Sequence, residues 1–143
     1  MSDNTNSVTK PLFWNNRYET KNDTWDLNKP TPIFINWEKS LNTNEKLKIC
    51  IPGCGKGHDA IYLASKGHDV TALDFSSKAL EYLKKKSKKN NLSIKFICGD
   101  FFRIQKKYYN YFDIVLEYTF FCAILPSKRK KYVKTCSKIL KKD

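Results

Sequence analysis

Four short apolar runs recur from residue 47 onward, and segments with helical periodicity separate them. The runs cover residues 47–51, 70–73, 94–98 and 112–117. Each is bounded by polar residues, which is typical of a buried strand. Strands that alternate with helices predict an α/β protein with a parallel sheet and right-handed crossover connections.

The intervening segments carry helix signals. Apolar residues at helical spacing span residues 60–64, and Gly67 follows as a stop signal. Ser76 is a good N-cap for a helix over residues 77–89. A last amphipathic helix is predicted over residues 127–142.

Three glycines at alternate positions, Gly53, Gly55 and Gly57, follow the first strand. Glycine lets the backbone approach a ligand closely, and the free N–H groups of the next helix point into the same space. A dinucleotide-binding turn reads G-x-G-x-x-G, but His58 stands where that motif has its third glycine. The spacing found here, G-x-G-x-G, is typical of S-adenosylmethionine (SAM) methyltransferases. The alternative is a tight turn in an ordinary α/β protein.

Acidic residues end the second and third predicted strands. Asp74 lies about 20 residues after the glycine turn, the usual place for a ribose-binding carboxylate. Asp100 and Phe101 follow the third strand. Because ligands of doubly wound sheets bind at the carboxyl ends of the strands, we expect Asp74 to accept hydrogen bonds from ribose hydroxyls. We expect Asp100 to accept one from the adenine amino group, with Phe101 against the base. Each aspartate taken alone could be a turn residue.

All three tryptophans lie between residues 12 and 37, before the first strand. The pattern predicts a short helix around residues 12–18 and an amphipathic helix that contains Trp37, which we expect to be a core anchor. Trp14 and Trp25 lie in irregular sequence, where an indole more plausibly forms a pocket wall. An indole face near a sulfonium cation would gain about 0.5 to 2 kcal/mol from cation–π attraction.

The net charge of +13 raises nucleic acid as a partner. The excess lies in residues 84–89 and 128–142, on the polar faces of predicted helices. Lysine greatly outnumbers arginine, whereas phosphate and base readers favour arginine. We therefore predict solvated helix faces and no specific nucleic-acid partner, with a basic nucleic-acid-binding module as the less favoured alternative.

The rest of the composition excludes several classes of protein. No run of 18 apolar residues exists, and the polar start lacks a secretory signal, so we expect a cytoplasmic protein without a membrane span. Residues 1–11 are predicted to be a mobile tail. The five cysteines contain no C-x-x-C pair and are expected to be reduced, mostly buried thiols, with no disulfide and no metal site.

Several segments together resemble the thiopurine S-methyltransferase superfamily, and within it the halide, thiol and thiocyanate methyltransferases. The resemblance runs from about Trp14 to the C-terminus, and it is carried by WNNRY, TWDLNKPTP, IPGCGKGHDA, ALDFSSKAL, GDFF and FDIVLEYTFFCAILPSKR. It implies a Rossmann-like domain over residues 12–143 that binds SAM, with an aromatic lid (residues 12–40) over an incomplete core (residues 47–143). Ile51 stands where many methyltransferases have an acidic residue, which agrees with this family.

The resemblance also implies roles for individual residues. Trp14, Tyr18 and Trp25 take the lid positions, and Tyr18 stands where close relatives carry tryptophan. The other cofactor-contacting positions correspond to Gly53, Gly55, Asp74, Asp100, Phe101 and Tyr118.

The implied reaction is an in-line displacement at the methyl group of SAM by a thiol, thiocyanate, halide or similar soft nucleophile. No catalytic residue is assigned. Glu117, Tyr118 and Cys122 lie near the site, and Glu117 and Cys122 are expected to have structural roles. Phe120, Phe121 and Ile124 would form an apolar pocket wall.

The resemblance also predicts that the sheet order is 3-2-1-4 with the later strands missing, as in a C-terminally truncated chain. The fourth strand would then be an uncovered edge that allows self-association. A SAM-binding but inactive fragment is therefore the alternative to an active enzyme.

Overall fold

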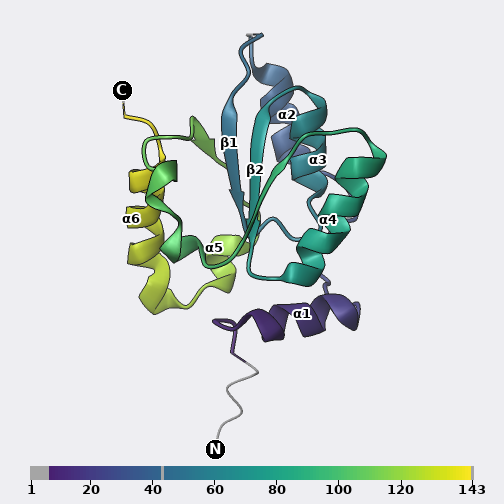
Figure 1. Cartoon of the computed structure of the whole chain (residues 1–143), viewed down its shortest axis with the longest axis vertical. Helices are drawn as coiled ribbons and strands as arrows, with labels where there is room; N and C mark the ends of the chain where they lie inside the picture. The colour runs from purple at the N-terminus through teal and green to yellow at the C-terminus, as the bar shows by residue number, and fades with distance from the viewer. Residues whose placement is uncertain (1–6, 43, 143) are drawn as a thin grey trace, which may run out of the picture.

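The computed structural model of the chain describes residues 7–42 and 44–142. Four strands form one parallel sheet in the order β3-β2-β1-β4 (Figure 1). They are β1 (Lys48–Pro52), β2 (Asp69–Asp74), β3 (Lys95–Cys98) and β4 (Ile114–Val115). All three strand pairs are parallel, so both the α/β class and the order 3-2-1-4 are confirmed.

Helices cover both faces of this sheet, and short 3-10 turns follow β3 and precede the last helix. The helices are α1 (Pro11–Glu19), α2 (Pro32–Ser40), α3 (His58–Ser65), α4 (Ser77–Lys89), α5 (Phe120–Ala123) and α6 (Arg129–Ile139). The 3-10 turns are η2 (Phe101–Arg103), η3 (Lys106–Tyr108) and η4 (Pro126–Lys128). In Figure 1, α2, α3 and α4 lie on one side of β1 and β2, and α6 lies on the other. Within the described residues, no helix is long and apolar enough to cross a membrane.

The alternation of side chains along β1 divides the core in two. Ile49 and Ile51 face α3 and α4, where they pack with Leu63 and Leu83. Cys50 points to the opposite face and joins a second cluster beneath α6. Both faces of the central strands are buried, which explains why their sequences read as continuous apolar runs.

Helix α1 lies apart from these layers. It crosses beneath the ends of β1 and β2, at the carboxyl side of the sheet (Figure 1). The Asn15 side chain fixes it to the start of α4, because Ser76 Oγ donates a hydrogen bond of 2.7 Å to Asn15 Oδ1. No residue of α1 is buried, so α1 covers the sheet edge without contributing to the core.

Two predicted boundaries near the C-terminus are wrong. The fourth strand pairs over Ile114–Val115 instead of residues 112–117, because Glu117 turns away to accept hydrogen bonds from the first amides of α5. The last helix ends at Ile139 and not at residue 142, because Leu140 is extended and forms a parallel bridge with Phe112.

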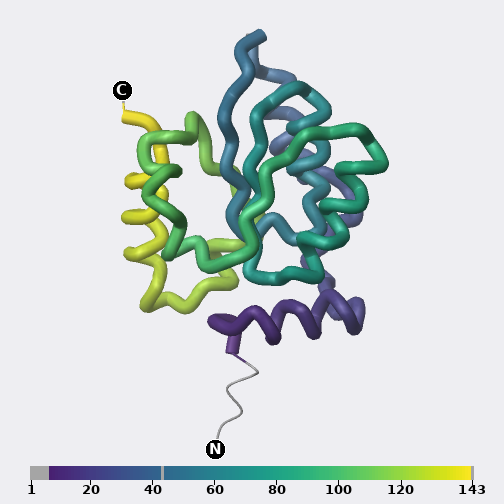
Figure 2. The backbone as a smooth tube through the Cα atoms, in the orientation of Figure 1, coloured from purple at the N-terminus to yellow at the C-terminus, as the bar shows by residue number. Residues whose placement is uncertain are grey.

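That bridge changes the predicted edge. The Phe112 N–H donates to Ile139 O (3.0 Å), and the Lys141 N–H donates to Phe112 O (2.8 Å). The yellow end of the tube in Figure 2 accordingly lies beside the green segment that leads into β4. The outer backbone groups of Phe112, expected to be unpaired, are therefore satisfied.

Part of the segment predicted as a tail, residues 7–11, falls within the described residues. Residues 1–6 lie outside the described residues, but residues 7–10 form a turn closed by a hydrogen bond from Lys10 N to Ser7 O (2.9 Å). Val8 O also accepts a hydrogen bond of 2.8 Å from Trp14 Nε1. The segment that contacts the site thus begins before residue 12.

Candidate functional site

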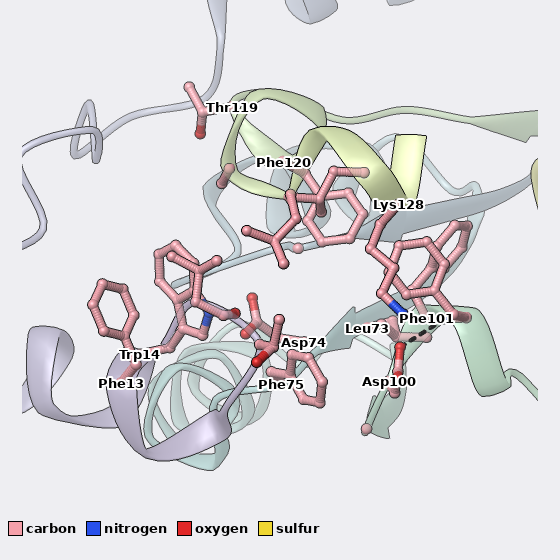
Figure 3. A pocket seen from close by; sticks show the side chains of 18 of the residues that line it. Phe13, Trp14, Leu73, Asp74, Phe75, Asp100, Phe101, Thr119, Phe120 and Lys128 are labelled. Atoms are coloured by element: carbon pink, nitrogen blue, oxygen red, sulfur yellow. Dashed lines mark hydrogen bonds between the residues drawn. The ribbon is translucent and has the colours of Figure 1, made fainter. Parts of the chain in front are cut away.

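A cavity of about 790 Å³ lies at the carboxyl ends of the strands, between the sheet and α1. Figure 3 shows the Asp74 side chain between Trp14 on one side and Phe101 on the other. The volume of the cavity falls within the range of about 300 to 1,000 Å³ that is usual for sites of small molecules and cofactors. Seven of the predicted site residues line it: Trp14, Tyr18, Trp25, Gly53, Asp74, Asp100 and Phe101.

The glycine turn brings backbone to this cavity. Gly53, Gly55 and Gly57 have φ angles of +61°, +57° and +77°, which L side chains rarely adopt. A Cβ at Gly53 would also overlap the Phe120 ring, and one at Gly55 would lie 2.9 Å from the Tyr18 hydroxyl. Both the conformation and the space therefore require glycine here.

Asp74 ends β2 and is held by backbone amides. Its Oδ2 accepts a hydrogen bond from Gly55 N and its Oδ1 accepts one from Ser76 N, both 2.8 Å long. Burial raises the pKa of Asp74, and these amide hydrogen bonds oppose that rise. A carboxylate has about four lone-pair sites, so Asp74 can accept a further hydrogen bond from a ligand hydroxyl.

Asp100 and Phe101 form the wall beyond β3. Asp100 Oδ1 accepts a hydrogen bond of 2.8 Å from Phe102 N, so this carboxylate caps η2 while it lines the cavity. The Phe101 ring is 2% exposed and lies 5.8 Å from Phe120 and 5.6 Å from Tyr132 between centroids. The Phe101 ring is thus packed among other aromatic rings in the cavity wall, next to the Asp100 carboxylate.

The lid supplies the opposite wall. The Trp25 ring meets Trp14 and Tyr18 edge-on, at centroid distances of 5.8 and 5.9 Å. Burial, and next the nearby Asp74 carboxylate, raise the pKa of Tyr18, so its hydroxyl stays protonated. Trp37, in contrast, packs against the core, as expected.

Comparison with known proteins identifies the family. The sequence profile of thiopurine S-methyltransferase (TPMT) matches residues 9–143. The chain belongs to the thiopurine S-methyltransferase family.

The chain is also similar to individual proteins that are named as thiol and thiocyanate methyltransferases. It is 35% identical over 132 residues to a probable thiol methyltransferase 2 of Arabidopsis thaliana, which covers 90% of this chain and 56% of the relative. It is 32% identical over 134 residues to thiocyanate methyltransferase 1 of Brassica oleracea, with 91% and 57% covered. The chain therefore spans little more than half the length of these relatives.

The fold is shared more widely. A 1,6-didemethyltoxoflavin N1-methyltransferase of Burkholderia thailandensis, solved with S-adenosylhomocysteine, superposes with a TM-score of 0.78 at 20% identity. The superposition covers 95% of this chain and 58% of the other. The Rossmann-like methyltransferase fold predicted for this TPMT-family chain is thus shown.

Tyr118 and Gly55 lie elsewhere than the other predicted site residues. Both line a second cavity of about 60 Å³, which adjoins the larger one at Tyr18, Trp25 and Gly53. Tyr118 is 45% exposed and does not line the larger cavity. The reason is local, because the chain reverses after Tyr118 with Thr119 in the left-handed conformation (φ +65°).

The segment after β4 has the structural roles expected for its polar side chains. Glu117 Oε2 accepts hydrogen bonds from Phe120 N and Phe121 N, so it caps α5. Cys122 lines the larger cavity, and its Sγ donates to Thr119 O at 3.2 Å. Phe120 and Ile124 line this cavity as predicted, but Phe121 packs on Tyr132 (5.2 Å) outside it.

The sequence reading missed several lining residues. Phe13 and Arg17 line the cavity beside Trp14 and Tyr18. These four residues occupy one face of α1, so the helical spacing itself could have found them. Phe75, which directly follows Asp74, also lines the cavity.

The thiols and acidic groups of the described residues form no metal centre. No group of three or more His, Cys, Asp or Glu side chains within residues 7–42 and 44–142 could hold a metal ion. All five cysteines are free, as expected, but Cys98 and Cys122 are exposed, which corrects the prediction that most would be buried.

Proposed function

We propose that this chain is the SAM-binding part of a methyltransferase that transfers a methyl group to a thiol, thiocyanate, halide or similar soft nucleophile. The observation that carries the proposal is the Asp74 carboxylate, held by Gly55 N at the glycine turn and open to the large cavity. Membership of the TPMT family and the names of the thiol and thiocyanate methyltransferases support the acceptor class.

The residues of the cavity fit SAM. Asp74 would hold the ribose hydroxyls, and Asp100 with Phe101 would hold the adenine. The backbone at Gly53, which also lines the cavity, would face the methionine part. SAM supplies an activated methyl group on a sulfonium cation.

The residues of this chain would act by position and by excluding water. Trp14, Trp25 and Tyr18 lie over the cavity and present aromatic faces and edges to it. Such a wall attracts a cation and keeps out water. A soft nucleophile needs little acid–base help, so placing it about 3 to 3.5 Å from the methyl group, in line with the breaking bond, accounts for the rate.

Calorimetric titration with S-adenosylhomocysteine (SAH) tests the site. Asp74→Ala should weaken binding by roughly 1 to 3 kcal/mol, the value of a hydrogen bond to a charged group. Asp69→Ala is the matched control, because Asp69 begins the same strand at its opposite end and pairs with Lys95 at 3.1 Å on the surface. Equal affinities of the two variants would place the ribose elsewhere.

Asp74 also holds backbone amides, so a milder change is needed beside Asp74→Ala. Asp74→Asn keeps one oxygen acceptor and should fold, yet it should still bind SAH more weakly than the wild type. Methyl transfer to iodide, thiocyanate and a small thiol is then measured by detecting the volatile or methylated product. Binding without transfer to any of them would favour the alternative, a chain that binds SAM and is inactive by itself.

A further inference from the structure

The lid loop (residues 20–31) joins α1 to α2 and carries Trp25. It is attached to the glycine turn through the side chain of Lys56 and to the first turn of α3 through those of His58 and Asp59. Thr31 donates two hydrogen bonds to Asp59, from its N–H at 2.6 Å and from its hydroxyl at 2.9 Å. Lys56 and His58 contact the other end of the loop.

Lys56 closes the turn that carries Trp25. The chain turns between Asp23 and Asp26, where Asp26 N donates to Asp23 O at 2.9 Å. Lys56 Nζ lies 2.7 Å from Asp23 Oδ2 and 3.7 Å from Asp26 Oδ2. The two carboxylates that flank Trp25 in the sequence are thus joined by one ammonium group of the glycine turn.

His58 contacts the same turn. Its Nε2 lies 2.8 Å from Asp26 Oδ1, and its Nδ1 lies 3.2 Å from Lys86 Nζ of α4. We call Asp23, Asp26, Lys56 and His58 the latch. It connects the lid loop, the glycine turn and α4.

The latch is poorly exposed to water. The side chains of Lys56 and Asp23 are 17% and 10% exposed, and that of Asp26 is 7% exposed. Ion pairs of this kind often contribute little net stability, because desolvation offsets their attraction, but they fix one arrangement of the chain. The hydrogen bond to Asp23 is the main cause that raises the pKa of Lys56, so this amine stays charged.

The segment 53–59 therefore contacts both the floor of the large cavity and the lid loop. The backbone of the glycine turn contacts Asp74 through Gly55 N, at the floor of the large cavity. Its side chains hold Trp25, which lines both cavities from above. A shift of the lid loop would thus be transmitted to the glycine turn, and a shift of the glycine turn would be transmitted to the lid loop.

We propose that Lys56, through Asp23 and Asp26, is a positioning residue that holds Trp25 over the cofactor site, so that cofactor affinity depends on an ion pair outside that site. This inference rests on the proposed function, in which the large cavity binds SAM. Lys56 does not line this cavity.

The principal alternative is that Lys56 binds an anionic group of a ligand directly. The two roles predict opposite effects when the carboxylates are removed. If Lys56 positions the lid, Asp23→Asn combined with Asp26→Asn weakens SAH binding, as Lys56→Met does. If Lys56 binds the ligand, the same change frees its ammonium group and strengthens binding.

The experiment measures SAH affinity by calorimetry in the full chain. We expect Lys56→Met to weaken binding by about tenfold, within the range of coupling between linked sites, and Lys56→Arg to restore most of it. Lys95→Met is the matched control, because Lys95 pairs with Asp69 at 3.1 Å and loses the same charge far from the lid. It should bind SAH as the wild type does.

A second readout follows the lid without any ligand. In a chain with Trp14→Phe and Trp37→Phe, Trp25 is the one remaining tryptophan, so the fluorescence comes from the lid loop. Lys56→Met should then increase the quenching of this fluorescence by acrylamide. A merely structural role would leave this quenching unchanged while lowering stability.

The outcomes separate the two proposals. If the wild type binds no SAH, the proposed function fails. If the wild type binds SAH and Lys56→Met binds it equally well, or if the double asparagine variant binds it more tightly, the positioning role of Lys56 is wrong.

Discussion

The floor and the lid of the large cavity are built by different means. The floor consists of Gly53, Asp74, Asp100 and Phe101. Gly53 and Asp74 stand at the ends of β1 and β2, whose side chains are almost all buried, and the Phe101 side chain after β3 is itself buried. The lid has no buried residue in either α1 or α2. It is attached by polar side chains, through Asn15, the latch and the pair of Thr31 with Asp59.

This difference separates stability from binding. Apolar burial is the main favourable term in folding, so a change in the floor should alter the free energy of unfolding first. The lid buries little, so a change there should mainly alter how the cofactor is held. Segments with few buried contacts are also those that open most readily, which suits a wall that a ligand must pass.

The largest effect is expected at Gly57, where the floor joins the core. Gly57 begins α3 with φ +77°, and a Cβ there would overlap the Leu83 side chain. Gly57→Ala should therefore cost about 2 to 4 kcal/mol, as the sum of a strained backbone and an overfilled core. Urea unfolding followed by circular dichroism measures this loss.

Gly99→Ala is the control for that change. A Cβ at Gly99 would meet nothing within 4 Å, so its unfolding midpoint should stay close to that of the wild type. If Gly57→Ala unfolds at the same urea concentration as Gly99→Ala, the glycine turn is not under the constraint that its geometry indicates.

The floor could be predicted from the sequence because local signals determine it. The alternation of buried strands, the glycine spacing and Asp74 at a strand end each follow from short-range patterns. Strand order, in contrast, was implied by the resemblance to the thiopurine S-methyltransferase superfamily and not by a local signal. The local signals placed Gly53, Asp74 and Phe101 at one edge of the sheet.

The lid attachments could not be predicted in this way. The partners Lys56 and Asp23, or Thr31 and Asp59, are far apart in the sequence, and no periodic pattern connects them. The place of Tyr118 beside the second cavity could not be predicted for a related reason, since the left-handed Thr119 turns the chain in a conformation that threonine rarely adopts. The end of α6 depended on the bridge between Leu140 and Phe112, which is also long-range.

An intermediate effect is expected at the second attachment of the lid loop. Thr31 is 6% exposed, and its hydroxyl donates to Asp59 Oδ2. Thr31→Val keeps the shape and the backbone bond, so it should cost about 1 to 2 kcal/mol of stability, the value of a hydrogen bond to a charged group. SAH binding should weaken as well, because this end of the lid loop is then held by the backbone bond from Thr31 N to Asp59 alone.

Thr135→Val provides a comparison at equal burial. Thr135 is also 6% exposed, but its hydroxyl donates to a neutral carbonyl, Lys131 O, within α6. The Thr135→Val variant should lose less than about 1 kcal/mol of stability and should bind SAH with unchanged affinity. Equal SAH affinities for the two variants would show that the loop needs no second attachment.

The smallest effect on stability is expected where α1 meets the core. Ser76 Oγ accepts a hydrogen bond from Ala79 N (3.2 Å), which caps α4, and donates one to Asn15 Oδ1. Asn15→Ala removes the second bond and a longer one of 3.4 Å from Lys78 N to Asn15 Oδ1, so it should cost about 0.5 to 1.5 kcal/mol. Ser76→Ala removes both bonds of Ser76 Oγ and should cost about 1 kcal/mol more, because the cap is lost too.

Combining the two changes shows whether α1 is attached through this bond alone. In the Ser76→Ala background, Asn15→Ala should cost less than in the wild type, since the bond to Ser76 is already gone and only the long bond from Lys78 N is lost. SAH affinity should fall in Asn15→Ala by more than its small loss of stability suggests, because α1 carries Trp14 and Tyr18 into the cavity. If affinity instead follows stability in the same proportion as it does for Gly57→Ala, the lid and the floor respond as one unit and the distinction between them does not hold.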